Sequence, residues 1–188
     1  MTAVSSTLKG SKANAKKSAQ FVGFRLADQG YLFPIGQIQE IVILGQVTKT
    51  PQVADYVEGV SNLRGTIIPI INLRRLFGLD PKSVDDQRRT IVVNVGARTI
   101  GCTVDAVTQV VRIADEDIKP APDLIAGAGT PWIAGFAKQE ESLLIVLNIN
   151  ELLDPEKLGQ VRKAVEASGL LNLGTATSAT DEPTTKTS

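Results

Sequence analysis

Histidine is absent from this chain of 188 residues, and cysteine occurs only once. Without histidine the chain has no Ser-His or Cys-His nucleophile pair, no histidine-ligated metal, and no side chain whose unperturbed pKa lies between about 5 and 8. The single cysteine, Cys102, has no partner for an internal disulfide, which is typical of proteins of the reducing cytosol. These absences argue against an enzyme, and they predict no catalytic residue, no metal site and no cofactor.

Net charge is also absent, because 20 basic residues balance 20 acidic ones. Nucleic acids and anionic membranes are bound mainly by positive charge, so neither is a favoured partner. No apolar run reaches the roughly 18 residues that a transmembrane helix needs, and the N-terminus lacks the apolar middle region of a signal peptide. The sequence therefore predicts a cytoplasmic protein with no nucleic-acid partner and no direct membrane insertion.

Aromatic residues make up 4% of the chain against 43% for all apolar residues, which predicts an aliphatic core. Most apolar residues lie in short runs that turn signals separate. Residues 21–35 and 90–104 each predict a hairpin. Helical signals are short: "LRRLFG" closed by Gly78, and a C-terminal segment with Asp154 as the N-cap and Gly169 as the stop.

The two ends of the chain have compositions that cannot bury enough apolar surface to offset chain entropy. Residues 1–18 are small and polar and carry four lysines, which predicts a disordered basic N-terminal arm. Residues 170–188 are rich in threonine and serine, which predicts a disordered tail. Neither end is assigned a function.

An internal repeat is the strongest organisational signal. Residues 56–77 align without a gap on residues 132–153, and Gly59 falls on Gly135. Farther upstream, a second alignment places Phe33 on Cys102. Each unit then consists of a hairpin, a third strand, a turn, a fourth strand and a short helix, which predicts two small β-barrels.

The repeat provides an internal control for one loop. "NLRG", residues 62–65, lies opposite "KQEE", residues 138–141, so the architecture tolerates arginine or glutamate and folding does not demand Arg64. One interpretation is that both loops are solvated polar turns. The other is a binding site, because Leu63 is apolar in a polar loop and a guanidinium offers five donors to a partner.

The stretch "GVSNLRGTIIPIINLRRLFGL", preceded by "YLFPIGQIQEI" and followed by "IKPAP", resembles the CheW family of chemotaxis coupling proteins. The resemblance covers residues 21–153. It implies a mainly all-β fold of two SH3-like five-stranded β-barrel subdomains packed side by side, with short helices and a C-terminal helix. We assign the first barrel to residues 19–87, the second to 88–153 and the C-terminal helix to 154–169.

The resemblance implies a non-catalytic adaptor of two-component signalling in motility. Its partners would be the regulatory domain of a CheA-like histidine kinase and the cytoplasmic tip of a methyl-accepting chemoreceptor, in arrays at the inner membrane. The family motif implies five receptor-binding residues: Arg64, Asn62, Glu40, Ile38 and Gly59. Three have competing interpretations: Ile38 belongs to the core if it points inward, Glu40 is a solvated acid at a strand end, and Gly59 recurs in the second unit and is then purely structural.

One position departs from the family pattern. Asn72 stands where the family usually has aspartate, and its repeat partner Asn148 suggests a turn-bonding side chain.

A CheW-like adaptor of pilus motility or phototaxis is one alternative function, and a ligand-binding double barrel without a kinase partner is another. A hydrolase built on the acidic residues 115–117 is disfavoured, because adjacent carboxylates in a polar loop do not face each other across a substrate. We expect Cys102 to be a buried apolar residue.

Overall fold

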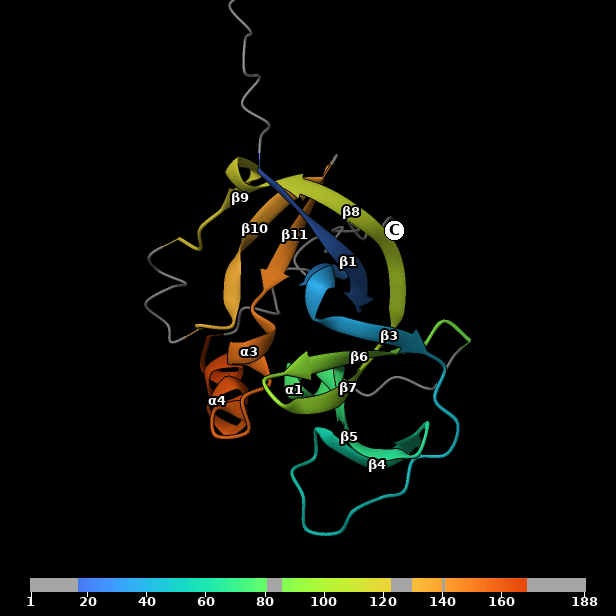
Figure 1. Ribbon diagram of the computed structural model, residues 1–188. Coiled ribbons are helices and arrows are strands. Elements are labelled where there is room, and N and C mark those ends of the chain that lie inside the picture. Colours follow the sequence, from blue (N-terminus) through green and yellow to red (C-terminus); the bar gives the residue numbers. More distant parts are fainter. Residues whose placement is uncertain (1–16, 81–85, 123–129, 140, 169–188) are drawn as a thin grey trace, which may run out of the picture.

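The structure is a computed structural model that describes residues 17–80, 86–122, 130–139 and 141–168 (Figure 1). The expected tail lies outside these residues, and so does most of the expected N-terminal arm. Ser18, which we had placed at the end of that arm, is the first residue of a strand.

Strands dominate the described chain, as the fold class predicted, and the few helices are short. Both predicted hairpins are confirmed, and so are the helix before Gly78 and the C-terminal helix, which begins later than expected. The elements are β1 (Ser18–Leu26), β2 (Gln29–Pro34), the 3-10 helix η1 (Ile35–Gln37), β3 (Ile38–Val42), β4 (Val57–Leu63), β5 (Thr66–Asn72), α1 (Leu73–Leu76), β6 (Arg89–Val95), β7 (Arg98–Val104), β8 (Ala106–Ala114), the 3-10 helix η2 (Asp115–Asp117), β9 (Ile118–Lys119), β10 (Ile133–Gln139), β11 (Ser142–Leu147), α3 (Ile149–Leu152) and α4 (Leu158–Ser168).

The strands form two sheets that do not divide at the boundary we expected between residues 87 and 88. Sheet A has the order β8-β1-β2-β11-β10-β9, and sheet B has the order β3-β6-β7-β5-β4. Sheet B is therefore one continuous stretch of chain inserted between two parts of sheet A. Four pairings join strands from different repeat units: β5 with β7 and β11 with β2 are parallel, and β1 with β8 and β3 with β6 are antiparallel. The chain passes between the sheets at η1, between β2 and β3, and at Asp105, between β7 and β8.

The repeat is nevertheless preserved in three dimensions. β4, β5 and α1 correspond to β10, β11 and α3 at the spacing that the alignment predicts. Both units have a β-bulge at the aligned glycine, Gly59 or Gly135. In both, an asparagine caps the short helix: Asn72 Oδ1 accepts from Arg75 N, and Asn148 Oδ1 accepts from Asn150 N.

The main hydrophobic core lies between the two sheets and joins them. The few aromatic residues concentrate there, contrary to the prediction of a purely aliphatic core. Phe24 has its ring centroid 4.7 Å from that of Phe33 and 5.6 Å from that of Tyr31, and Phe77 stacks on Tyr31. A smaller cluster packs within each sheet, around Leu32 in sheet A and around Ile68 in sheet B.

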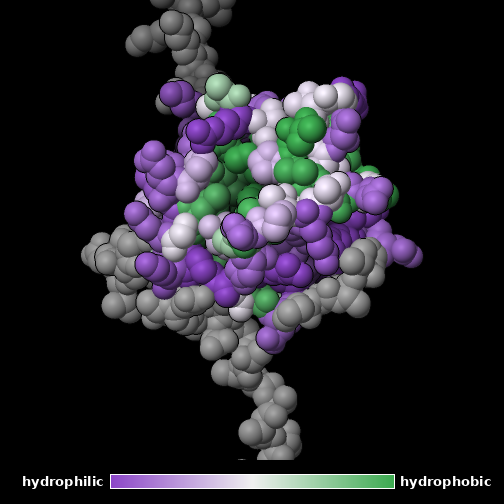
Figure 2. All heavy atoms as spheres, turned by 90° about the horizontal axis from the view of Figure 1, so that it is seen from below, coloured by the Kyte–Doolittle hydropathy of each residue, from purple (hydrophilic) through white to green (hydrophobic). Residues whose placement is uncertain are grey.

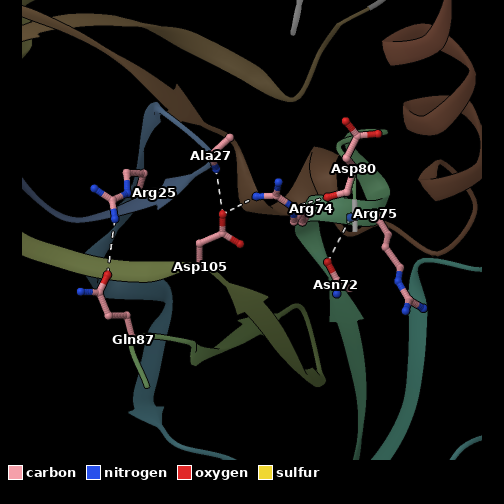
Figure 3. A network of polar contacts seen from close by, with 8 residues as sticks. All are labelled: Arg25, Ala27, Asn72, Arg74, Arg75, Asp80, Gln87 and Asp105. Atoms are coloured by element: carbon pink, nitrogen blue, oxygen red, sulfur yellow. Dashed lines mark hydrogen bonds and ion pairs between the residues drawn. The ribbon is translucent and has the colours of Figure 1, made fainter. Parts of the chain in front are cut away.

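A polar network fixes the second passage between the sheets (Figure 3). Asp105 Oδ2 accepts from the main-chain N–H of Ala27, 2.8 Å away in sheet A, and pairs at 2.5 Å with Arg74 Nη1 on α1. Arg74 Nε donates to the main-chain oxygen of Asp80. Both charged side chains are largely buried, so the turn between β1 and β2 is held against α1 of the other sheet.

Candidate functional site

The turn between β4 and β5 holds Arg64 in an unusual backbone conformation. Leu63 pairs with Thr66, and the two residues between them have positive φ: 51° at Arg64 and 90° at Gly65. A two-residue hairpin turn with positive φ at both positions favours asparagine, aspartate or glycine. Left-handed backbone costs a residue such as arginine about 1–2 kcal/mol. Turn stability therefore does not explain Arg64.

Asn62 holds this turn in place, because its Oδ1 accepts a hydrogen bond from Gly65 N at 2.8 Å. Arg64 Nη2 forms an ion pair with Glu40 Oε2 at 2.8 Å. The Arg64 side chain is 79% exposed, so the pair contributes at most about 1 kcal/mol to stability. Glu40 lies on β3 and Arg64 follows β4, so the pair joins the two edges of sheet B.

A groove of about 570 Å³ opens beside this ion pair, and we call it the arginine-turn groove. β3 and the end of β4 form two sides of the groove. The third side is formed by the segment 43–49, which crosses from β3 toward β4 and which we call the strap. The strap is held by Thr48, whose N–H and C=O both bond to Val60 at 2.8 and 2.9 Å. Ser61 Oγ donates to Gln46 O at 3.3 Å. The groove is lined by Glu40, Val42, Ile43, Leu44, Gly45, Gln46, Thr48, Ser61, Asn62, Leu63 and Arg64.

The structure brings together three of the five predicted binding residues, Arg64, Asn62 and Glu40, on this groove. Ile38 is half-buried and packs against the core between the sheets, in accord with its competing structural interpretation. Gly59 lies at the bulge with φ 140°, where an added Cβ would stand 2.0 Å from Thr48 O. Glycine is required there because the strap approaches its backbone so closely.

Exposed aliphatic side chains lie on the strap and on β3 and β5, and the sequence interpretation missed them. The exposed fraction is 72% for Ile43 and 71% for Ile67, and Ile41 is exposed as well. Figure 2 views the molecule from the side where β4 and β5 lie and shows hydrophobic atoms gathered on this face among hydrophilic ones. Isoleucine occurs at both buried and exposed positions of β3 and β5. The apolar pattern of these strands therefore did not show which isoleucines are exposed.

The remaining candidates for chemistry have structural surroundings. Cys102 is fully buried, and burial raises the pKa of its thiol far above the usual range, so it carries no thiolate. The acidic residues 115–117 form one exposed turn, η2, rather than a cleft. Within the described ranges, no group of three or more His, Cys, Asp or Glu side chains is placed to hold a metal ion. None of the helices described is long and apolar enough to cross a membrane.

Comparison with known proteins gives one consistent family. The family model for the CheW-like domain matches residues 20–157. The chemotaxis protein CheW of Klebsiella aerogenes is 37% identical over 142 residues, which cover 76% of this chain and 86% of that protein. CheW of Helicobacter pylori is 36% identical over 71% of this chain and 81% of its own. The protein PilI of Pseudomonas aeruginosa is 28% identical over 70% of this chain and 74% of its own.

A solved structure gives the same result. The crystal structure of the scaffolding protein TtCheW from Thermoanaerobacter tengcongensis aligns with a TM-score of 0.66 at 30% identity. The alignment covers 73% of this chain and 94% of that one. The arrangement of two β-sheets with few helices therefore agrees with the CheW scaffold.

Proposed function

Because the chain belongs to the CheW-like domain family, we propose that it is the adaptor that couples chemoreceptors to a CheA-like histidine kinase. It acts by holding two proteins in a fixed geometry and performs no chemistry of its own. Its partners are the cytoplasmic tip of a receptor and the regulatory domain of the kinase. Through them the adaptor is held, in the cytoplasm, at receptor arrays on the inner membrane.

The observation that carries this proposal is the exposed Arg64 in its left-handed turn. The backbone conformation disfavours arginine, and the second repeat unit has no arginine at the corresponding turn. The ion pair with Glu40 uses a single nitrogen, Nη2, and the side chain is largely exposed, so other donors of the guanidinium are open to a partner beside the groove. An arginine that the backbone disfavours and that keeps exposed donors supports a role for Arg64 in binding a partner rather than in folding.

The receptor tip would contact the arginine-turn groove, with Arg64, Asn62 and Glu40 as the polar contacts. Ile43 and Ile67 would supply the apolar contact area. Such a surface resembles the anatomy of protein interfaces, in which an arginine and apolar side chains form the centre of the contact. Ile38 and Gly59 would act indirectly, by positioning β3 and the strap.

The test compares three variants for binding to the receptor tip and to the kinase regulatory domain. Arg64→Glu should lose receptor binding by tenfold or more, roughly the effect of removing one arginine anchor, and should keep kinase binding. Arg98→Glu is the matched control, because Arg98 is an exposed arginine at the hairpin between β6 and β7. The exchange Arg64→Glu with Glu40→Arg restores the ion pair with reversed charges.

The exchange separates direct contact from a structural role. If Arg64 contacts the receptor, the exchanged protein will still fail to bind it. Full recovery of receptor binding in the exchanged protein would show that only the ion pair matters and would contradict the contact. Absence of kinase binding by the folded wild-type protein would contradict the adaptor function itself.

A second candidate function rests on the likeness to PilI. In this alternative the same two surfaces would serve a pilus-motility system with its own kinase. Binding of the purified protein to the regulatory domains of each CheA-like kinase of its organism, side by side, distinguishes the two. The tighter complex identifies the system that it serves.

A further inference from the structure

A second groove lies on the other side of the strap. Its volume is about 610 Å³, and we call it the basic groove. Along the strap, Gln46 and Thr48 line the arginine-turn groove, whereas Val47 and Lys49 line the basic groove. Side chains of an extended segment point alternately to opposite sides. The two grooves therefore lie back to back, and residues 43–45 line both.

The basic groove carries an excess of positive charge in a protein whose net charge is zero. Four basic and two acidic side chains line it: Lys49, Arg75, Arg88, Arg89, Glu58 and Asp86. Of the two acids, Glu58 is already occupied. Its Oε1 accepts from Asn72 and pairs with Arg88, and its Oε2 accepts from Thr103.

Two of the arginines form no ion pair with a carboxylate of the described residues. Arg75 Nη1 donates to the main-chain oxygen of Asp55 at 3.1 Å. Arg89 Nη1 donates to the main-chain oxygens of Asp86 and Arg88 at 2.7 and 2.8 Å. Main-chain bonds orient a guanidinium without removing its charge, so both side chains are pre-positioned to receive a carboxylate.

The opposite wall of the basic groove is aliphatic. Ile43, Leu44 and Val47 of the strap line it, and Ile43 is 72% exposed. A groove with one basic and one aliphatic wall is complementary to a chain segment that carries carboxylates on one side and aliphatic side chains on the other. A small anion would leave the aliphatic wall without a contact.

We propose that the basic groove is a docking site for an acidic and aliphatic segment of a protein partner, and that this partner is the kinase. The assignment to the kinase rests on the proposed function. A coupling adaptor must hold two partners at once, and the receptor is assigned to the opposite face of the strap. Because residues 43–45 belong to both grooves, each partner then contacts the same short segment, which gives the two binding events a physical connection.

The test measures affinity of the full chain for the kinase regulatory domain, at low and at moderate salt. The variant Arg75→Gln with Arg89→Gln removes both charges, and glutamine keeps a donor for the main-chain oxygens. Arg112→Gln is the control, because Arg112 is an exposed arginine on β8 of sheet A. A thermal melt of each variant establishes that it is folded.

We expect the double variant to bind the kinase domain at least about tenfold more weakly than wild type, with a smaller salt dependence. Arg112→Gln should bind as wild type, and saturating receptor tip should not displace the kinase domain. Equal kinase affinity of the folded double variant and wild type would overturn the proposal. So would displacement by the receptor tip, or loss of receptor binding in place of kinase binding. Failure of the wild type to bind the kinase would instead overturn the proposed function, and this inference with it.

Discussion

The Asn72→Asp substitution exchanges one good helix-capping residue for another, yet we expect it to destabilise this protein. Asn72 Nδ2 donates to Glu58 Oε1 at 2.6 Å, while its Oδ1 caps α1. Aspartate can still cap the helix, but it cannot donate to Glu58. The substitution would replace a hydrogen bond with two carboxylates in contact, inside a network that also contains Arg88 and Thr103.

The size of the effect follows from two terms. A hydrogen bond to a charged group contributes about 1.5–3 kcal/mol. Two like charges about 4 Å apart repel by roughly 4 kcal/mol at an effective dielectric constant of about 20, and the charge of Arg88 offsets much of this repulsion. We therefore expect the free energy of unfolding at pH 7 to fall by about 2–4 kcal/mol. The deficit should shrink at low pH, where protonation of the introduced carboxylate removes the repulsion.

Urea denaturation provides the measurement, and the repeat provides its control. Asn148 caps α3 in the same manner, but the residue that corresponds to Glu58 is Ala134. An aspartate at position 148 would therefore not meet a carboxylate at the equivalent of Glu58. Asn148→Asp should change stability by less than about 0.5 kcal/mol, because both residues are good caps. Glu58→Gln should make Asn72→Asp less harmful, with a coupling energy of at least about 1 kcal/mol. Equal costs for Asn72→Asp and Asn148→Asp would refute this reasoning.

Two further predictions concern buried side chains. The thiol of Cys102 should react with a disulfide reagent only after unfolding, and reaction of the native protein within minutes would contradict its burial. Burial raises the pKa of this thiol, so as the pH rises the unfolded chain loses the thiol proton before the folded chain does. The free energy of unfolding should therefore be unaffected below a pH of about 8.5 and should fall above it by up to about 1.4 kcal/mol per pH unit. Cys102→Ala should reduce this slope. The Tyr31 hydroxyl is buried without a hydrogen-bond partner among the described residues. Tyr31→Phe should therefore raise the free energy of unfolding, measured by urea denaturation, by about 1 kcal/mol. A lower free energy of unfolding would contradict this prediction and would show that the hydroxyl has a hydrogen-bond partner.

The local features of this fold could be predicted from the sequence because they depend on neighbouring residues. The hairpins, the short helix before Gly78 and the gapless repeat all follow from turn chemistry and apolar spacing. The repeat even predicts the shared helix cap of Asn72 and Asn148. What it could not predict is which strands pair in parallel, because such pairing joins residues far apart in the chain and has no local signal.

The candidate site shows the same limit. Arg64, Asn62 and Glu40 were predicted from a motif, but the ion pair between Arg64 and Glu40 depends on how sheet B brings its two edges together. The strap was missed because residues 43–49 have no regular secondary structure, and their role depends on the single bridge between Thr48 and Val60. The inward direction of Ile38 likewise depends on the other sheet, which covers it.

The insertion of sheet B within sheet A leads us to expect an order of assembly during synthesis. All strands of sheet B lie between residues 38 and 104, so this sheet can close as soon as β7 has left the ribosome. Sheet A cannot, because its first hairpin, β1 and β2, must wait for β8 and β11 to emerge. Closing that long loop costs little extra entropy if sheet B has already folded and shortened the distance between its ends. We therefore expect the outer sheet to be completed last, against an inserted sheet whose strands have already paired.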